Sequence, residues 1–274
     1  MTSPGAMPAA GEPSGDGGGP SRPAAGAAGA TGYPPRPVAD SAGRNWGGRT
    51  LPAGGFEDDD GAADPALVDA LGAGDAELMA ALSGARLLVA VVAEASETVE
   101  SASGHTADVG VDMSLVTLVA PDGRRALPAF TSLAALARWD AGARPVPVLA
   151  DRMAQAAIAE SCDAVVLDLA DAGRELRPSQ VWALAMRRTW LPPHEDPFVA
   201  DAVAAALAAE PAVAGHERYA GEPAGSGVLG IALSLTPGLD AGAVQDLVTR
   251  VGERLATDGE FRARIDGLAF RLVG

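Results

Sequence analysis

Residues 113–132 read MSLVTLVAPDGRRALPAFTS, and this stretch decides the fold that the sequence predicts. Residues 113–120 are mostly apolar and predict a strand, the pair Asp122-Gly123 is typical of a hairpin turn, and residues 125–130 predict the returning strand. Thr131 or Ser132 then stands where a helix N-cap is expected, because a hydroxyl oxygen can accept a hydrogen bond from an unpaired backbone N–H of the first turn. The block therefore predicts a strand, a turn, a strand and a helix.

Apolar runs on both sides of this block predict further strands. Residues 86–92 are apolar without alternation, so we expect other elements to cover both faces of that strand. Shorter runs predict strands at residues 146–149, 164–169 and 174–176. N-cap and proline signals predict helices that begin near Pro65, Asp75, Ser132, Asp151 and Pro178.

A proline-rich connector at residues 191–197 marks the best boundary within the ordered part of the chain. Beyond it the pattern predicts a helix, strands at 212–219 and 228–235, a helix capped by Asp240 and a strand at 268–273. We therefore expect the α/β class, in the looser α+β sense, with two small mixed-sheet subdomains after a disordered N-terminal tail. The expected parts are a tail at 1–45, an N-terminal domain at 46–190 and a C-terminal α-β-β-α-β domain at 198–274.

The tail at residues 1–45 is rich in Gly, Pro, Ala and Ser and shows no apolar period. Such a segment buries too little surface to offset its ordering entropy, so it is predicted to be disordered. Its sequence Pro34-Pro35-Arg36-Pro37 is that of an extended spacer or of a polyproline docking segment. After it, Trp46 to Phe56 predicts an irregular arm on the domain surface.

Composition excludes several chemistries. The net charge is −16 and all 20 basic residues are arginine, so the lysine of a phosphate-binding P-loop and every lysine Schiff base are missing. An acidic chain without clustered basic residues is not expected to bind nucleic acid or an anionic membrane. Cys162 is the one cysteine, which excludes an intrachain disulfide. With no signal peptide and no apolar run of about 18 residues, we expect a cytoplasmic protein that spans no membrane.

Two stretches of the chain resemble the SseB family in its actinobacterial form. One is the block at 113–132, and the other runs from Trp46-Gly47-Gly48-Arg49-Thr50-Leu51-Pro52 to Phe56 and on to Leu67. The resemblance covers residues 46–274 and implies an N-terminal and a C-terminal SseB-like region. It supplies no agreed catalytic residue, ligand or cofactor, although the family name reflects a link to serine sensitivity.

Other motifs fit known sites poorly. Residues 225–230 match GxGxxG, but a loop precedes them and a predicted strand follows, whereas a dinucleotide site needs a strand before and a helix after. Glu57-Asp58-Asp59-Asp60-Gly61 lacks the first and last ligands of a calcium loop, so a solvated acidic turn is expected. The remaining candidates are three scattered histidines that show no zinc spacing, and a cysteine expected to pack in the interior: His105, His194, His216 and Cys162.

Two further features leave alternatives open. The hydroxyls of Thr131 and Ser132 could cap a helix or form a phosphate-binding turn, and the cap is favoured. Three tryptophans could belong to the core or line a binding face, and the core is favoured: Trp139, Trp182 and Trp190.

Because none of the catalytic motifs considered above fits the sequence, we expect a non-catalytic protein-interaction or regulatory module without cofactor or metal. The partner is expected to be a protein, bound in part through Trp46 and Phe56, since exposed irregular segments can order on a partner. The alternatives are a small-metabolite binder, such as an amino-acid binding protein linked to serine metabolism, and an enzyme whose carboxylates and arginines assemble only in three dimensions.

Overall fold

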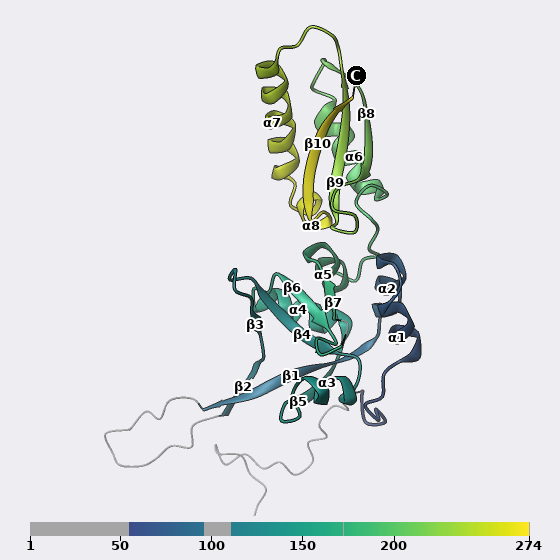
Figure 1. Cartoon of the computed structure of the whole chain (residues 1–274), viewed down its shortest axis with the longest axis vertical. Helices are drawn as coiled ribbons and strands as arrows, with labels where there is room; N and C mark the ends of the chain where they lie inside the picture. Colours follow the sequence, from purple (N-terminus) through teal and green to yellow (C-terminus); the bar gives the residue numbers. More distant parts are fainter. Residues whose placement is uncertain (1–54, 96–110, 172, 274) are drawn as a thin grey trace, which may run out of the picture. The chain divides into compact units, whose positions relative to one another are not determined.

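The structure, a computed structural model, describes residues 55–95, 111–171 and 173–273 (Figure 1), and these described residues belong to one compact unit. The predicted tail at 1–45, Trp46, His105 and most of the loop before residue 111 lie outside the described residues. The structure contains a seven-stranded and a three-stranded sheet, both mixed, with helices beside them. The predicted α+β class is therefore confirmed.

Two regions are named here by their sheets: the large-sheet region, residues 55–190, and the small-sheet region, residues 197–273. The helices of the large-sheet region are α1 (Pro65–Leu71), α2 (Asp75–Leu82), α3 (Leu133–Trp139), α4 (Ala150–Ala159) and α5 (Pro178–Ala185). Its strands are β1 (Arg86–Ala95), β2 (Val111–Leu115), β3 (Leu118–Val119), β4 (Arg125–Phe130), β5 (Arg144–Leu149), β6 (Ala164–Leu167) and β7 (Arg174–Leu176). The small-sheet region contains α6 (Pro197–Leu207), β8 (Val213–Ala220), β9 (Val228–Leu235), α7 (Ala241–Thr257), α8 (Gly259–Arg264) and β10 (Gly267–Val273).

The large sheet runs in the order β2-β1-β4-β6-β7, with β3 added to β4 and β5 added to β1. Among the described strands of this sheet only the β4–β6 pair is parallel, which makes the sheet mixed. Alternate residues of β1 serve two different cores. Leu87 and Val89 pack into the core shared with α1, α2, α4 and α5, whereas Leu88 and Ala90 pack with Phe130 and α3. Both faces of β1 are therefore covered, as its continuous apolar run predicts.

The predicted strand at 113–120 is wrong in one respect, because it is two strands. β2 pairs with β1, whereas β3 pairs with β4 through the hairpin at Asp122-Gly123. Between them the Val116 backbone N–H donates to the Ala90 carbonyl at 3.0 Å, the last such contact with β1 before the chain turns toward β4. A continuous apolar pattern does not reveal this change of partner.

Helix starts follow the cap signals closely. Ser132 caps α3, since its hydroxyl accepts the Ala135 backbone N–H at 3.1 Å, and Asp64 caps α1 ahead of Pro65. The hydroxyl of Thr131 is occupied elsewhere, donating to the buried carboxylate of Asp168 at 2.7 Å. The predicted cap at Asp151 is wrong: α4 begins one residue earlier, and the Asp151 carboxylate pairs with Arg187 instead.

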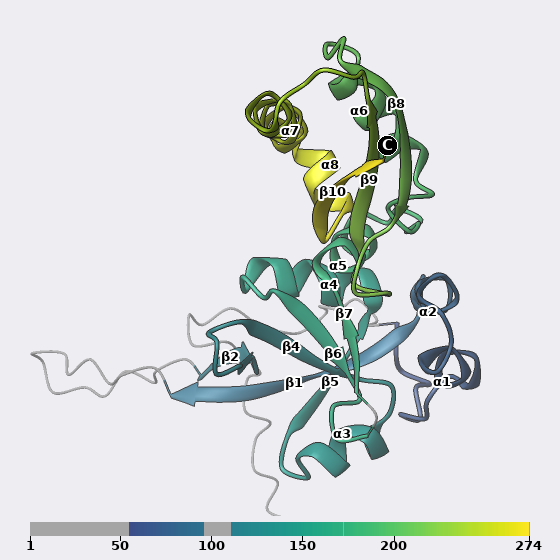
Figure 2. The ribbon, with the colours of Figure 1, turned by 45° about the horizontal axis from the view of Figure 1, so that its top comes forward.

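The small sheet places β9 between antiparallel β8 and parallel β10. One face of β9 packs on α6, α7 and α8 through a core that includes Leu229, Ile231 and Leu233. The short helix α8 lies beside the start of β10 in Figure 2 and has no counterpart in the predicted α-β-β-α-β pattern. The core around α7 follows from its apolar positions at helical spacing: Val244, Leu247, Val248, Val251 and Leu255.

The GxGxxG stretch leads into β9, so its glycines serve packing and turns in this chain. Gly225 and Gly227 have φ values of 77° and 73°, a conformation that favours glycine. A Cβ on Gly227 would overlap the Asp266 carboxylate, and a Cβ on Gly230 would overlap the Tyr219 ring. Glycine is thus required at positions 225, 227 and 230 for turns and packing, and this spacing matches the nucleotide-binding motif by coincidence. The helix that such a motif needs after the glycines is replaced here by β9.

Candidate functional site

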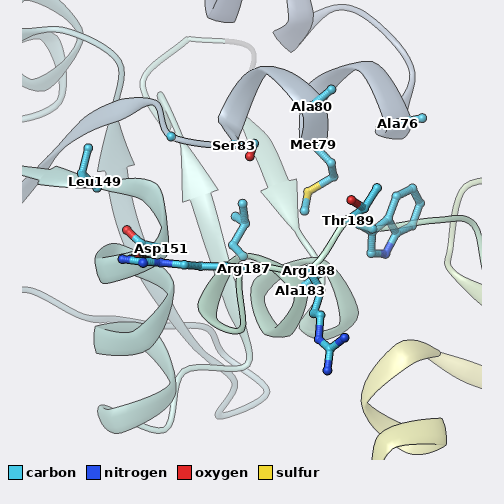
Figure 3. Close-up of a pocket in the computed structure, with 13 residues that line it drawn as sticks. Ala76, Met79, Ala80, Ser83, Leu149, Asp151, Ala183, Arg187, Arg188 and Thr189 are labelled. Atoms are coloured by element: carbon cyan, nitrogen blue, oxygen red, sulfur yellow. Dashed lines mark hydrogen bonds and ion pairs between the residues drawn. The ribbon is translucent and has the colours of Figure 1, made fainter.

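An open groove of about 680 Å³ lies between α2, the start of α4 and the segment that follows α5 (Figure 3). The side chain of Met79 points from α2 into the space above α5 in this view. Small residues widen the groove on both sides, because Ala76 and Ala80 line it from α2 and Ala183 lines it from α5. A groove with an apolar floor and short side walls can accept a bulky apolar side chain.

The floor belongs to the hydrophobic core and is firmly supported. Met79 and Trp190 are 5% and 7% exposed, and Leu184 is 6% exposed. The Trp190 indole N–H donates to the Ser179 hydroxyl at 3.2 Å, which fixes the ring against α5. The floor is thus pre-formed, and an occupant would not have to order it.

The polar rim of the groove begins at the C-terminus of α5. The Arg188 backbone N–H donates to the Ala183 carbonyl at 2.8 Å and the Arg187 N–H donates to the Leu184 carbonyl at 3.0 Å. These two bonds form a Schellman motif, in which the residue at the Arg187 position is usually glycine. Arg187 has a φ of 53°, so an arginine here is held in a left-handed conformation at an energetic cost.

The Arg187 side chain extends along the groove to Asp151, as Figure 3 shows. Its Nε lies 2.6 Å and its Nη2 lies 2.5 Å from Asp151 Oδ2. Burial raises the pKa of the Asp151 carboxyl, but the hydrogen bonds from Arg187 and from the Arg152 backbone N–H outweigh it and hold this pKa below its usual value. The carboxylate is 13% exposed and the arginine 66% exposed, so the guanidinium is the accessible partner.

Arg188 adds a second positive charge at the same rim. Its side chain points away from α2 in Figure 3 and makes no ion pair or hydrogen bond with the residues that the structure describes. The groove lining contains two arginines and one carboxylate, Asp151, in a chain of net charge −16. This rim is therefore locally basic on an acidic protein.

A network called here the Arg177 cluster joins the two regions beside the groove; its members are Asp75, Arg174, Arg177, Ser179 and Asp266. Asp75 accepts hydrogen bonds from Arg174 and Arg177 at 2.7 and 2.8 Å. Burial raises the pKa of Asp75, yet these arginines hold it below its usual value. Asp266 accepts from Arg177 Nε at 3.0 Å and from the Ser179 hydroxyl at 2.7 Å. The cluster is fully paired and has a structural role.

A second contact between the regions is built on Arg264. Its guanidinium lies 5.4 Å from the Trp182 ring centroid and 4.7 Å from the Phe198 ring centroid, and it pairs with Asp196 at 2.7 Å. Trp182 is thereby explained as a packing residue. Trp139 packs against Phe130 at 5.3 Å between ring centroids, while Trp190 belongs to the core and also borders the groove.

Phe56, one of the two residues proposed from the sequence for partner binding, does not line this groove. Phe56 is half-buried and lines a separate shallow hollow with Glu57, Asp58, Asp59 and Arg86. Asp59 pairs with Arg86 at 2.8 Å, which anchors the acidic turn to the start of β1. Trp46 lies outside the described residues. The groove itself was missed by sequence reasoning, and the one signal in the sequence was an arginine pair, Arg187-Arg188, directly after a helix.

The remaining candidates are dispersed. His194 contacts Glu195 at 3.5 Å, His216 is exposed on β8, and burial raises the pKa of the Cys162 thiol. Within the described part of the chain no group of three His, Cys, Asp or Glu side chains is arranged to hold a metal ion. No helix there is both long and apolar enough to cross a bilayer.

Residues 64–183 match a family model described as the SseB protein N-terminal domain. The match begins at the N-cap of α1 and ends within α5, so it spans the large sheet and includes Met79 of the groove floor but not Leu184, Trp190 or the arginine rim. The resemblance seen in the sequence is thereby confirmed for this region. Neither the curated proteins nor the solved structures yield a match to the chain.

Proposed function

We propose that this chain, whose residues 64–183 match the SseB N-terminal domain model, is a non-catalytic protein-binding module whose docking site is the groove between α2 and α5. The observation that carries the proposal is the groove itself: about 680 Å³ of open volume over a buried apolar floor, with an arginine rim. A bulky apolar side chain of a partner would fill the space above Met79, and a carboxylate beside it would face the exposed Arg187 guanidinium at the rim. Apolar anchors in pre-formed pockets carry most of the energy of such contacts.

The backbone strain at Arg187 supports the same function. A left-handed arginine costs about 1–2 kcal/mol relative to an unstrained residue, and a glycine would avoid that cost. Strained positions cluster at sites where the side chain is needed. The arginine therefore contributes something that glycine cannot, and the exposed guanidinium at the rim is the group available for a partner.

A small metabolite fits this groove less well than a protein segment. Sites for small ligands enclose most of the ligand surface, whereas this groove is open to solvent. Binding of a free amino acid is the alternative function, and the experiment below distinguishes it from binding of a protein.

The test is affinity capture from the source cell with the full chain and two matched variants. Ala80→Arg places a long side chain in the groove from an exposed position of α2, and Ala137→Arg makes the same change at an exposed position of α3 outside it. We expect a protein partner that is retained by wild type and Ala137→Arg and lost with Ala80→Arg. Direct binding measured with the purified partner should weaken at least tenfold, since one anchor is worth about 2 kcal/mol or more.

Two results would contradict the proposal. One is equal capture of the same partner by all three proteins, which would place binding elsewhere on the chain. The other is a saturable rise in melting temperature with a free amino acid, together with no captured partner, because a ligand that binds only the folded state stabilises it. That result would select the metabolite-binding alternative.

A further inference from the structure

A second pocket, of about 280 Å³, adjoins the groove at the N-terminal end of α2 and is called here the side pocket. Ala76 and Trp190 line both the groove and the side pocket, so the two hollows meet at these residues. Pro192 and Pro193 line the side pocket from the connector. The hydrogen bond from the Trp190 indole to Ser179 fixes the boundary between the two hollows.

The side pocket carries a surplus of negative charge. Asp75, Glu77 and Arg177 line it. Asp75 and Arg177 pair with each other at 2.8 Å, and their side chains are 20% and 16% exposed. His194 also lines the pocket and contacts Glu195 at 3.5 Å. Glu77 is exposed, so its carboxylate is the charge of this lining that an occupant can reach.

The two hollows together present opposite charges at their two ends. Figure 3 shows the Arg187 side chain directed toward Asp151, at the side of the groove away from Ala76. Glu77 follows Ala76 in α2 and therefore lies at the other end. The residues of α2 that line the groove run from Ala76 to Ser83, which is about 10 Å along a helix and matches about three residues of an extended chain.

We propose that the groove and the side pocket form one binding site for an extended segment of a partner protein that contains an acidic, a bulky apolar and a basic residue in this order. The inference rests on the proposed function of the groove. The acidic residue faces Arg187, the apolar residue fills the space above Met79, and the basic residue faces Glu77. This site adds a requirement for a basic residue, which the groove alone does not impose.

Charge complementarity selects this occupant. Opposite charges placed at the two ends favour one arrangement of the segment, because like charges facing each other oppose binding. The chain has a net charge of −16, so a purely acidic segment would be repelled by most of its surface. A basic residue beside Glu77 offsets that repulsion.

The test is selection of peptides from a random phage-displayed library on the immobilised full chain, followed by anisotropy titrations with one labelled synthetic peptide of the enriched sequence. We expect enriched sequences with an acidic, a large apolar and a basic residue at fixed spacing. Glu77→Arg should weaken binding of this peptide about three- to tenfold, because an exposed attraction becomes a repulsion. A peptide whose basic residue is replaced by glutamine should not respond to Glu77→Arg, as a double-mutant cycle requires. Arg187→Gly and the acidic residue of the peptide should show the same coupling.

Glu253→Arg is the matched control. It makes the same change of charge at an exposed position of α7 that lines neither hollow, and should bind the peptide like wild type. Glu77→Gln removes the charge with little change of size and should weaken binding less than Glu77→Arg. Added salt should reduce the effect of Glu77→Arg, since exposed charges are screened. Melting temperatures of the variants establish that they fold.

The outcomes separate this inference from the proposed function. Equal binding by wild type, Glu77→Arg and Glu253→Arg, with binding still lost in Ala80→Arg, would overturn the inference and leave the groove as the docking site. Peptide binding that Ala80→Arg does not weaken would contradict the proposed function itself. Enriched sequences without the basic residue, or a selection that enriches no sequence, would also overturn the inference.

Discussion

Gly227→Ala is expected to destabilise the protein far more than Gly225→Ala. Both glycines have left-handed φ values, 73° and 77°, in the same loop. They differ in their surroundings, because a Cβ on Gly225 meets nothing within 4 Å, whereas a Cβ on Gly227 would overlap the Asp266 carboxylate and lie 2.9 Å from Arg177 Nε. The pair of variants therefore separates backbone strain from disruption of the Arg177 cluster.

The magnitudes follow from these contacts. Alanine in the left-handed region costs about 1–2 kcal/mol, of which about 0.4–1 kcal/mol is regained because alanine restricts the unfolded chain. Gly225→Ala should therefore lower the free energy of unfolding by about 1 kcal/mol. Gly227→Ala also moves Asp266, whose side chain is 6% exposed, away from Arg177. Breaking a buried pair costs about 3–5 kcal/mol, and since Arg177 keeps its bond to Asp75 we expect about 2–4 kcal/mol beyond the control.

Urea denaturation of the three proteins, followed by tryptophan fluorescence and by circular dichroism, measures the difference. Coincident transitions from the two probes establish that a single free energy of unfolding is meaningful. If Gly227→Ala and Gly225→Ala unfold at the same urea concentration, the Asp266–Arg177 contact contributes little and the reasoning fails.

Three further predictions concern single side chains. At the end of α5, Arg187→Gly should be more stable than Arg187→Ala by about 0.5–1 kcal/mol in urea denaturation, since both lose the Asp151 contact and only glycine relieves the strain; equal stability would contradict the Schellman assignment. At the start of α3, Ser132→Ala should cost about 1 kcal/mol by the same measurement, while Ser132→Asp, which keeps the cap, should cost little. In the small-sheet region the hydrogen bond from Arg250, joined by that from Arg254, lowers the Glu210 pKa to about 2 against the opposing effect of burial. Because this folded-state pKa lies below the ordinary value of 4.5, the stabilisation is present above about pH 4.5 and is lost as pH falls toward 2; with both arginines substantially exposed it should be on the order of 1 kcal/mol. Glu210→Gln should flatten that part of the stability–pH curve, and an unchanged curve would refute the assignment.

Local signals in the sequence predicted most of the fold. Asp64-Pro65, Ser132 and Asp240 each mark a helix start because a capping side chain acts on backbone groups only two or three residues away. The apolar run of β1 predicted a strand buried on both faces for the same local reason. Two predictions were wrong because they depend on residues far apart in the sequence. The break between β2 and β3, and the pairing of Asp151 with Arg187, are determined by tertiary contacts.

The candidate site was predicted poorly, and the cause is also physical. Its floor consists of ordinary core residues, such as Met79 and Trp190, and its walls consist of alanines. None of these residue types has a spacing that distinguishes a groove from a packed interior. The strained backbone of Arg187 is visible only in three dimensions, since any residue type can follow a helix in sequence.

The Arg177 cluster has a kinetic consequence. Arg177 lies 102 residues after Asp75 and 89 residues before Asp266, so its two ion pairs close very long loops. Contacts of such sequence separation are slow to form and are expected after the transition state for folding. Interactions absent from the transition state slow unfolding without speeding folding. We therefore expect Asp266→Asn to accelerate unfolding, with its refolding rate nearly unchanged, so that this cluster sets how long the two regions stay joined.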